Sequence, residues 1–77
     1  MHLHLGGHLS WYDARRRAWV EIHIDAPTPL ADVLRQLNVP VDEVAVTAVQ
    51  GRAVDVREAI VSYGDRVEVY PPIGGGV

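Results

Sequence analysis

The 77-residue sequence contains no cysteine and no lysine, and each absence removes a class of chemistry. Without cysteine the chain has no disulfide, no thiolate metal site and no thiol nucleophile, so sulfur chemistry here cannot use a side-chain thiol. All seven basic residues are arginines, so only the α-amino group is available to a reaction that needs an amine. Codon bias is the ordinary explanation for missing lysine.

Long apolar runs and positive charge are also scarce. No run approaches the ~20 residues of a membrane span, and no basic start precedes an apolar signal core. We therefore expect a cytoplasmic protein with no membrane partner. The net charge of −3 argues against a nucleic-acid partner, because only the arginines at 15–17 cluster. A chain of 77 residues fills one core and forms one domain.

The first half of the chain changes from strand to helix periodicity. Residues 2–5 and 19–24 alternate between polar and apolar, which predicts two antiparallel strands joined by an irregular or hairpin loop. Thr28 is predicted to cap a helix and Pro29 to lie in its first turn. The apolar face of that helix is Leu30, Val33, Leu34 and Leu37.

The second half reads as strands and tight turns, after Asn38 and Pro40 end the helix. We predict a strand over 44–49, a turn at Gln50-Gly51, a short return strand over 52–56, a turn at Gly64-Asp65 and a last strand over 67–70. The order predicts an α+β fold, with a mixed four- to five-stranded sheet and one main helix packed on one face.

Three stretches carry a resemblance to a known family: "PLADVLRQLNVP", "VAVTAVQGRAV" and "GDRVEVYPPIGGG". Together they resemble the ubiquitin-like β-grasp sulfur carriers, which include the small subunit of molybdopterin synthase and the sulfur carrier of thiamine biosynthesis. The resemblance implies a β-grasp domain over residues 1–72 and a flexible glycine-rich tail over 73–77.

The resemblance also implies a mechanism. In those carriers a ubiquitin-activating-type adenylyltransferase uses ATP and magnesium to adenylate the C-terminal glycine carboxylate. A persulfide then converts it to a thiocarboxylate, which is delivered to a sulfur-accepting synthase subunit. By resemblance, Gly76 is the adenylation and thiocarboxylate site, and Gly74 and Gly75 belong to the tail. No cofactor is expected on the chain itself.

Physical chemistry supports a tail of this composition. Glycine has no Cβ, so a glycine run passes through a narrow channel in a partner enzyme and adapts to it. Pro71 and Pro72 end the hydrogen bonding of the last strand and stiffen the exit. By resemblance, the partner-binding surface adjoins the last strand, and we expect its residues to be Pro71, Pro72 and Ile73. Val67 and Val69 alternate with polar residues and should be core.

Val77 departs from the family pattern, in which the chain ends in Gly-Gly. It moves the carboxylate onward by roughly 3.3–3.6 Å and adds a stiff β-branched side chain. Three interpretations follow: a peptidase removes Val77 and exposes Gly76, the partner tolerates valine, or the carrier role has been lost and the chain is a binding module.

His2 and His4 fall on one face of the first predicted strand, with His8 nearby. No cysteine or acidic residue is placed to complete a site with them, so we expect no bound metal and solvent-facing histidines. His23 is expected to be exposed as well.

Trp11, Tyr12 and Trp19 flank the arginines at 15–17. Interleaved aromatic and basic residues can stack on nucleotide bases, but in a small acidic domain they more often close a hairpin or contact a protein. The second interpretation is favoured here.

No residue pattern suggests catalysis by the chain alone. Asp55, Glu58 and Asp65 lie near predicted turns, where caps and turn hydrogen bonds are the ordinary role of carboxylates, and no nucleophile motif surrounds either serine. We therefore expect a protein that is not an enzyme. The alternatives to a sulfur carrier are a ubiquitin-like modifier joined to lysines of target proteins and a non-covalent subunit of an enzyme complex.

Overall fold

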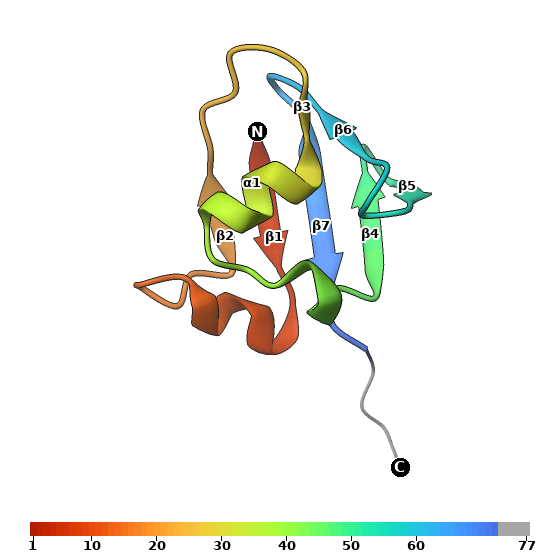
Figure 1. Ribbon diagram of the computed structural model, residues 1–77. Helices are drawn as coiled ribbons and strands as arrows, with labels where there is room; N and C mark the ends of the chain where they lie inside the picture. Colours follow the sequence, from red (N-terminus) through yellow and green to blue (C-terminus); the bar gives the residue numbers. More distant parts are fainter. Residues whose placement is uncertain (73–77) are drawn as a thin grey trace.

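The computed structural model describes residues 1–72 and contains a five-stranded mixed sheet with one α-helix across one face (Figure 1). The strand order is β2-β1-β7-β4-β5. A two-stranded ribbon, β3 with β6, lies beside the start of the helix. The bounds are β1 His2–Leu5, β2 Trp19–Glu21, β3 Thr28–Pro29, α1 Leu30–Gln36, β4 Val46–Val49, β5 Arg52–Val54, β6 Ile60–Val61 and β7 Arg66–Tyr70.

The centre of the sheet is the parallel pair of β1 and β7, where Leu3 lies opposite Val67. The outer neighbours β2 and β4 run antiparallel to this pair. Side chains alternate across a strand, so Leu3 and Leu5 face the helix while His2 and His4 face the other side. The predicted α+β class, the antiparallel pairing of the first two strands and the single main helix are confirmed.

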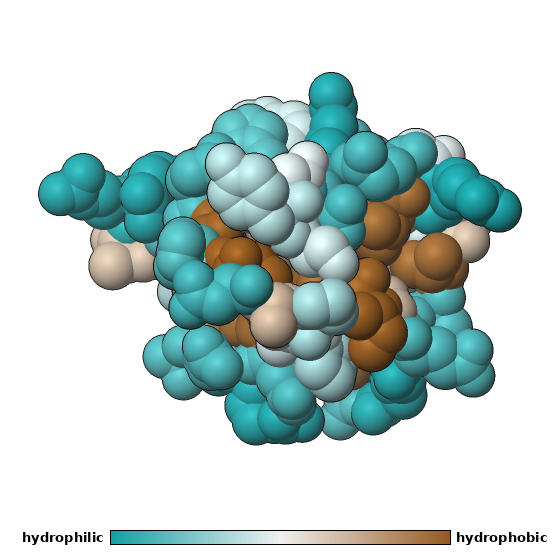
Figure 2. All heavy atoms as spheres, turned by 90° about the horizontal axis from the view of Figure 1, so that it is seen from above, coloured by the Kyte–Doolittle hydropathy of each residue, from teal (hydrophilic) through white to brown (hydrophobic). Residues whose placement is uncertain are grey.

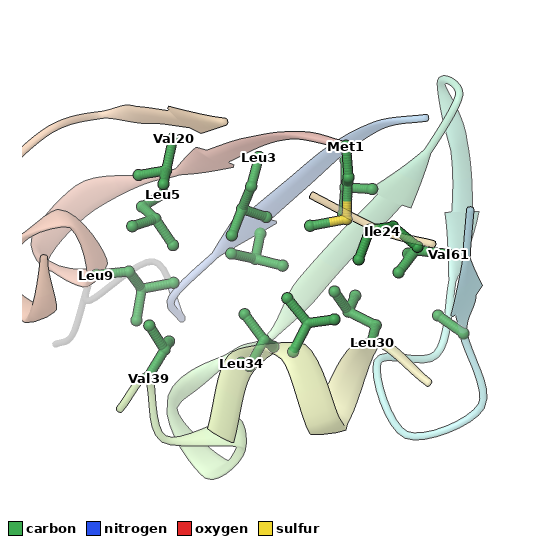
Figure 3. Close-up of a cluster of buried hydrophobic side chains, with 14 residues drawn as sticks. Met1, Leu3, Leu5, Leu9, Val20, Ile24, Leu30, Leu34, Val39 and Val61 are labelled. Carbon is green, nitrogen blue, oxygen red and sulfur yellow. The ribbon is translucent and has the colours of Figure 1, made fainter. Parts of the chain in front are cut away.

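The core is a continuous cluster between the sheet and α1 (Figure 3). Leu34 points from the helix toward the sheet on the side of Leu3, and Leu30 points toward Ile24 and Met1. Val67 and Val69 are fully buried, as predicted. The buried apolar residues are Met1, Leu3, Leu5, Leu9, Val20, Ile24, Leu30, Val33, Leu34, Val39, Ala59, Val61, Val67 and Val69.

The start of the helix differs from the prediction. Thr28 does not cap α1, because Thr28 and Pro29 pair with β6 and the Thr28 hydroxyl donates to the Ala26 carbonyl at 2.8 Å. Pro29 itself takes the N-cap position, with extended backbone. At the other end the predicted stop is confirmed, since Asn38 adopts φ 62°, which no helical residue has.

Three strands are shorter than predicted, and one of them, expected over 52–56, ends at Val54. The strand expected over 19–24 ends at Glu21, although Ile24 is still buried, and the strand expected over 44–49 begins at Val46. Two 3₁₀ helices, η1 (Gly7–Tyr12) and η2 (Val41–Glu43), occupy segments expected to be a loop and a turn. Short 3₁₀ segments leave no long period in a sequence to detect.

The predicted turns are present. Gln50 and Gly51 have φ of 53° and 79°, the positive values of a tight hairpin turn. Gly64 has φ 83°, and the Asp65 carboxylate accepts a hydrogen bond from the Ser62 backbone N–H at 2.8 Å.

Much of the surface is hydrophilic, with apolar patches among the polar side chains in the view from above (Figure 2). Val54 and Ile60 are exposed to 38% and 54%, on the side of the molecule where β5 and β6 lie. Within residues 1–72, no helix combines the length and the apolar character that crossing a bilayer requires.

Candidate functional site

The last strand leads the chain away from the sheet at Tyr70. The Ala45 N–H donates to the Tyr70 carbonyl and the Gly6 N–H donates to the Val69 carbonyl, both at 2.8 Å. Pro71 and Pro72 follow, and neither has an N–H to continue the ladder. The strand therefore stops where the sequence predicts.

Gly6 and Gly7 pack directly against this exit. A Cβ on Gly6 would overlap the Tyr70 ring at Cδ1 and lie 3.1 Å from the Val69 carbonyl oxygen. A Cβ on Gly7 would lie 2.9 Å from Pro71 Cγ, and Gly7 also has a positive φ of 52°. The two glycines follow β1 directly, and because they have no side chain, Tyr70 and Pro71 can approach the backbone at the end of β1.

An apolar hollow opens beside the exit, with a volume of about 410 Å³. Val46 lines it and is 51% accessible. It pairs directly with Tyr70, so both side chains lie on the outer face of the sheet. We call this the tail-exit surface, and its residues are Gly7, Val46, Tyr70, Pro71 and Pro72.

The predicted partner-binding residues are thus only partly placed. Pro71 and Pro72 belong to the tail-exit surface, as expected. Val46 and Tyr70 were missed, although the alternation of each strand could have assigned them to one face. Ile73, the glycines at 74–76 and Val77 lie outside the described residues.

The outer face next to this surface carries a row of rings. His2 stacks on Trp19 with ring centroids 4.7 Å apart, and His4 packs on Trp19 at 4.6 Å and on Tyr70 at 5.5 Å. The Arg66 guanidinium carbon lies 5.0 Å from the Trp19 ring centroid.

The prediction that both strand histidines face solvent is therefore wrong for His4. Its ring is half-buried, and its Nδ1 is buried without a hydrogen-bond partner in the described part of the chain. His2 and His23 are exposed, as expected. Among residues 1–72, no three His, Asp or Glu side chains are grouped so that they could hold a metal ion.

A polar cluster ties η1 to η2 near the exit. Glu43 accepts hydrogen bonds from His8 Nε2 at 2.7 Å and from the Tyr12 hydroxyl at 2.8 and 2.9 Å. The hydrogen bond from His8, and then that from Tyr12, hold the pKa of Glu43 below its ordinary value. The hydrogen bond to Glu43 raises the pKa of Tyr12 in turn.

Two of the remaining carboxylates serve turns, as predicted. Asp55 accepts a hydrogen bond from the Arg57 backbone N–H at 2.8 Å, and Asp65 serves the turn at Gly64. The described residues thus place the end of β7 beside an apolar surface made of Gly7, Val46, Tyr70, Pro71 and Pro72.

Comparison with known proteins agrees with this architecture. A search of curated proteins found no match. The family model described as Mut7-C ubiquitin matches residues 8–74, which cover the helix, every described strand except β1, and the two prolines. The chain therefore belongs to the Mut7-C ubiquitin family and is a ubiquitin-like protein with the β-grasp fold.

Proposed function

We propose that this chain is a sulfur carrier whose functional group is the carboxylate of Gly76, and that it is not itself an enzyme. The observation that carries the proposal is the tail-exit surface, which lies at the end of β7, a strand that three residues separate from Gly74, Gly75 and Gly76 in the sequence. The recipient is a synthase subunit in molybdopterin, tungstopterin or thiamine biosynthesis, or in a related pathway.

The chemistry needs partners for every step. A Gly76 carboxylate oxygen attacks the α-phosphorus of magnesium ATP on a ubiquitin-activating-type adenylyltransferase, and pyrophosphate leaves. A persulfide sulfur on a partner then attacks the acyl carbon and displaces AMP, which gives an acyl disulfide. A second partner thiol cleaves the S–S bond, leaving a thiocarboxylate on Gly76 and a disulfide on the partner. This chain has no cysteine, so both sulfur groups are supplied by the partner.

The residues of this chain bind the partner and position the Gly76 carboxylate. Val46, Tyr70 and Pro72 offer the partner an apolar contact beside the exit. Glycine at 74–76 leaves room for a narrow channel, since no Cβ projects from the backbone. Val77 does not fit such a channel, so the active form arises when a processing peptidase cleaves the bond between Gly76 and Val77.

The test is adenylation in vitro with purified components. The chain ending at Gly76 and the chain ending at Val77 are each incubated with ATP, magnesium and an activating enzyme from the same genome, and then weighed by mass spectrometry. We expect an acyl-adenylate on the shorter chain only. Adenylation of neither chain by any activating enzyme of that genome would contradict the proposal.

One observation favours a second function, that of a non-covalent subunit of an enzyme complex. The tail-exit surface offers Val46 and Tyr70 to a partner whether or not a carboxylate is free beyond it. In that case a partner would bind both chains equally well and no adenylate would form. Conjugates of higher mass, joined to lysines of other proteins, would instead identify a ubiquitin-like modifier.

A further inference from the structure

Trp11 is the most exposed tryptophan of the chain, with 66% of its surface accessible. It lies on η1, which leads into the loop over residues 13–18, here called the arginine loop. Tryptophan and arginine are enriched among the residues that contribute most to protein–protein binding. Burial in the core does not account for a tryptophan as exposed as Trp11. Neither Trp11 nor the arginine loop belongs to the tail-exit surface.

The arginine loop is held in one shape by Asp13. Its carboxylate accepts hydrogen bonds from the backbone N–H groups of Arg15 and Arg17, both at 3.0 Å. It also receives Nε and Nη2 of Arg17 at 3.0 and 2.9 Å, and these hydrogen bonds hold the pKa of Asp13 well below its usual range. The charge of Arg17 is thereby balanced by Asp13, and holding the loop does not use the side chains of Arg15 and Arg16.

The other two arginines stay available. Both are exposed, and within residues 1–72 neither guanidinium forms an ion pair. Arg16 has φ 57° and its guanidinium carbon lies 5.8 Å from the Trp11 ring centroid, within cation–π range. Asp13 and the three arginines together carry a charge of +2, so the rest of this chain of net charge −3 carries −5.

A recess of about 220 Å³ lies beneath the loop. Apolar side chains of the core line it, from Leu5 and Val20 on the sheet and from Leu37 and Val39 at the end of the helix. Tyr12 and Asp13 also line it. The recess is smaller than the ~300 Å³ at which small-molecule pockets begin, and it suits one large apolar side chain.

We propose that Trp11, the arginine loop and the recess beneath it form a docking site for an acidic segment of a partner protein. Carboxylates of the segment pair with Arg15 and Arg16, and one apolar side chain of the segment enters the recess that Tyr12 and Ala14 border. Two free arginines on a chain of net charge −3 are too few for nucleic acid, whose binding rests on many phosphate contacts. This site is independent of the proposed carrier function, because it uses neither the tail-exit surface nor the carboxylate.

The test uses the full chain and a defined probe, the heptapeptide Glu-Glu-Asp-Leu-Asp-Glu-Glu. Amide and indole NMR shifts are followed as the peptide is added. We expect saturable shifts at Trp11, Ala14 and Val39, with affinity that falls as salt rises. Replacing the peptide leucine by glycine should weaken binding about tenfold or more, because one apolar side chain is no longer buried.

Variants of the chain separate this site from general attraction of charge. The double variant Arg15→Glu with Arg16→Glu should bind at least about tenfold more weakly. It should keep the thermal midpoint of the parent, because the substitutions remove neither hydrogen bond to Asp13: one comes from the backbone N–H of residue 15 and the other from the side chain of Arg17. Arg52→Glu, an exposed arginine on β5, is the matched control and should leave binding unchanged.

Three results would overturn the proposal. They are the absence of saturable shifts at Trp11, an equal loss of binding in the Arg52→Glu variant, or tighter binding of decathymidylate than of the peptide at the same loop. The last result would identify a nucleic-acid site. Because no activating enzyme or ATP is present, none of these results bears on the carrier function.

Discussion

Gly6→Ala tests whether the close packing at the tail exit is required. Gly6 has φ −76° and ψ 155°, which alanine adopts without strain, so the cost comes from contacts alone. The new Cβ would overlap Tyr70 Cδ1 and lie 3.1 Å from the Val69 carbonyl oxygen. The overlap with the Tyr70 ring is the larger of the two, because the Val69 oxygen would have to shift by only a few tenths of an ångström.

The expected magnitude follows from two opposing effects. Overpacking costs about 1–3 kcal/mol, and the lower entropy of the unfolded chain returns about 0.4–1 kcal/mol. We therefore expect Gly6→Ala to lower the free energy of unfolding by about 1–2 kcal/mol. In a domain of this size each kcal/mol corresponds to roughly 4–8 °C in the thermal midpoint.

A double-mutant cycle with Tyr70→Ala identifies the cause, measured by urea unfolding. With the ring removed, Gly6→Ala should lose most of its cost, which leaves a coupling of about 1 kcal/mol. Gly51→Ala is the control, because Gly51 has φ 79° and no atom within 4 Å of an added Cβ. It should cost about 1 kcal/mol of backbone strain in either background. A neutral Gly6→Ala, or a cost that Tyr70→Ala does not relieve, would refute the reasoning.

Three further predictions concern binding, pH and the core. Val46→Asp should change the free energy of unfolding by less than about 0.5 kcal/mol and should lower the kcat/KM of adenylation. The control is Ile60→Asp, which is equally exposed on another side and should leave the kcat/KM of adenylation unchanged. Because the pKa of Glu43 is lowered in the folded protein, ionised Glu43 stabilises the fold above the ordinary glutamate pKa, and this stability is lost as pH falls through the folded pKa. Glu43→Gln should therefore make the urea midpoint depend less on pH between pH 6 and pH 3. Part of the pH dependence should remain in this variant, because the pKa of Asp13 is also lowered. Leu34→Ala removes a fully buried side chain and should cost about 2–5 kcal/mol in urea unfolding.

Each of these three predictions would be contradicted by a definite result. Equal loss of adenylation in Val46→Asp and Ile60→Asp would mean that the tail-exit surface has no special role. An unchanged pH slope in Glu43→Gln would remove the His8–Glu43–Tyr12 cluster from the acid stability of the protein. A loss below 1 kcal/mol in Leu34→Ala would mean that the core is looser than its burial indicates.

Periodicity predicted the parts of the fold that bury a continuous face. The apolar spacing of Leu30, Val33 and Leu34 predicted the helix, and the alternation around Val67 and Val69 predicted the last strand. Thr28 was assigned wrongly because its role depends on pairing with β6, a contact between distant segments. The 3₁₀ helix before the arginine loop was missed because six residues are too few to show a period.

For a similar reason, the sequence predicted only some residues of the candidate site. Pro71 and Pro72 follow directly from their place after the last strand, whereas Val46 joins them only through its register with Tyr70. The close approach of Gly6 to Tyr70 depends on the parallel pairing of β1 and β7. A local pattern predicts which face a residue occupies and leaves open which residue lies opposite.

The central claim, that Gly76 carries the transferable sulfur, is tested most directly by mass spectrometry of the protein isolated from its native cell. The account predicts a population that ends at Gly76, part of it with one carboxylate oxygen replaced by sulfur. If every molecule retains residue 77 and none contains sulfur in place of oxygen, the carrier function is contradicted.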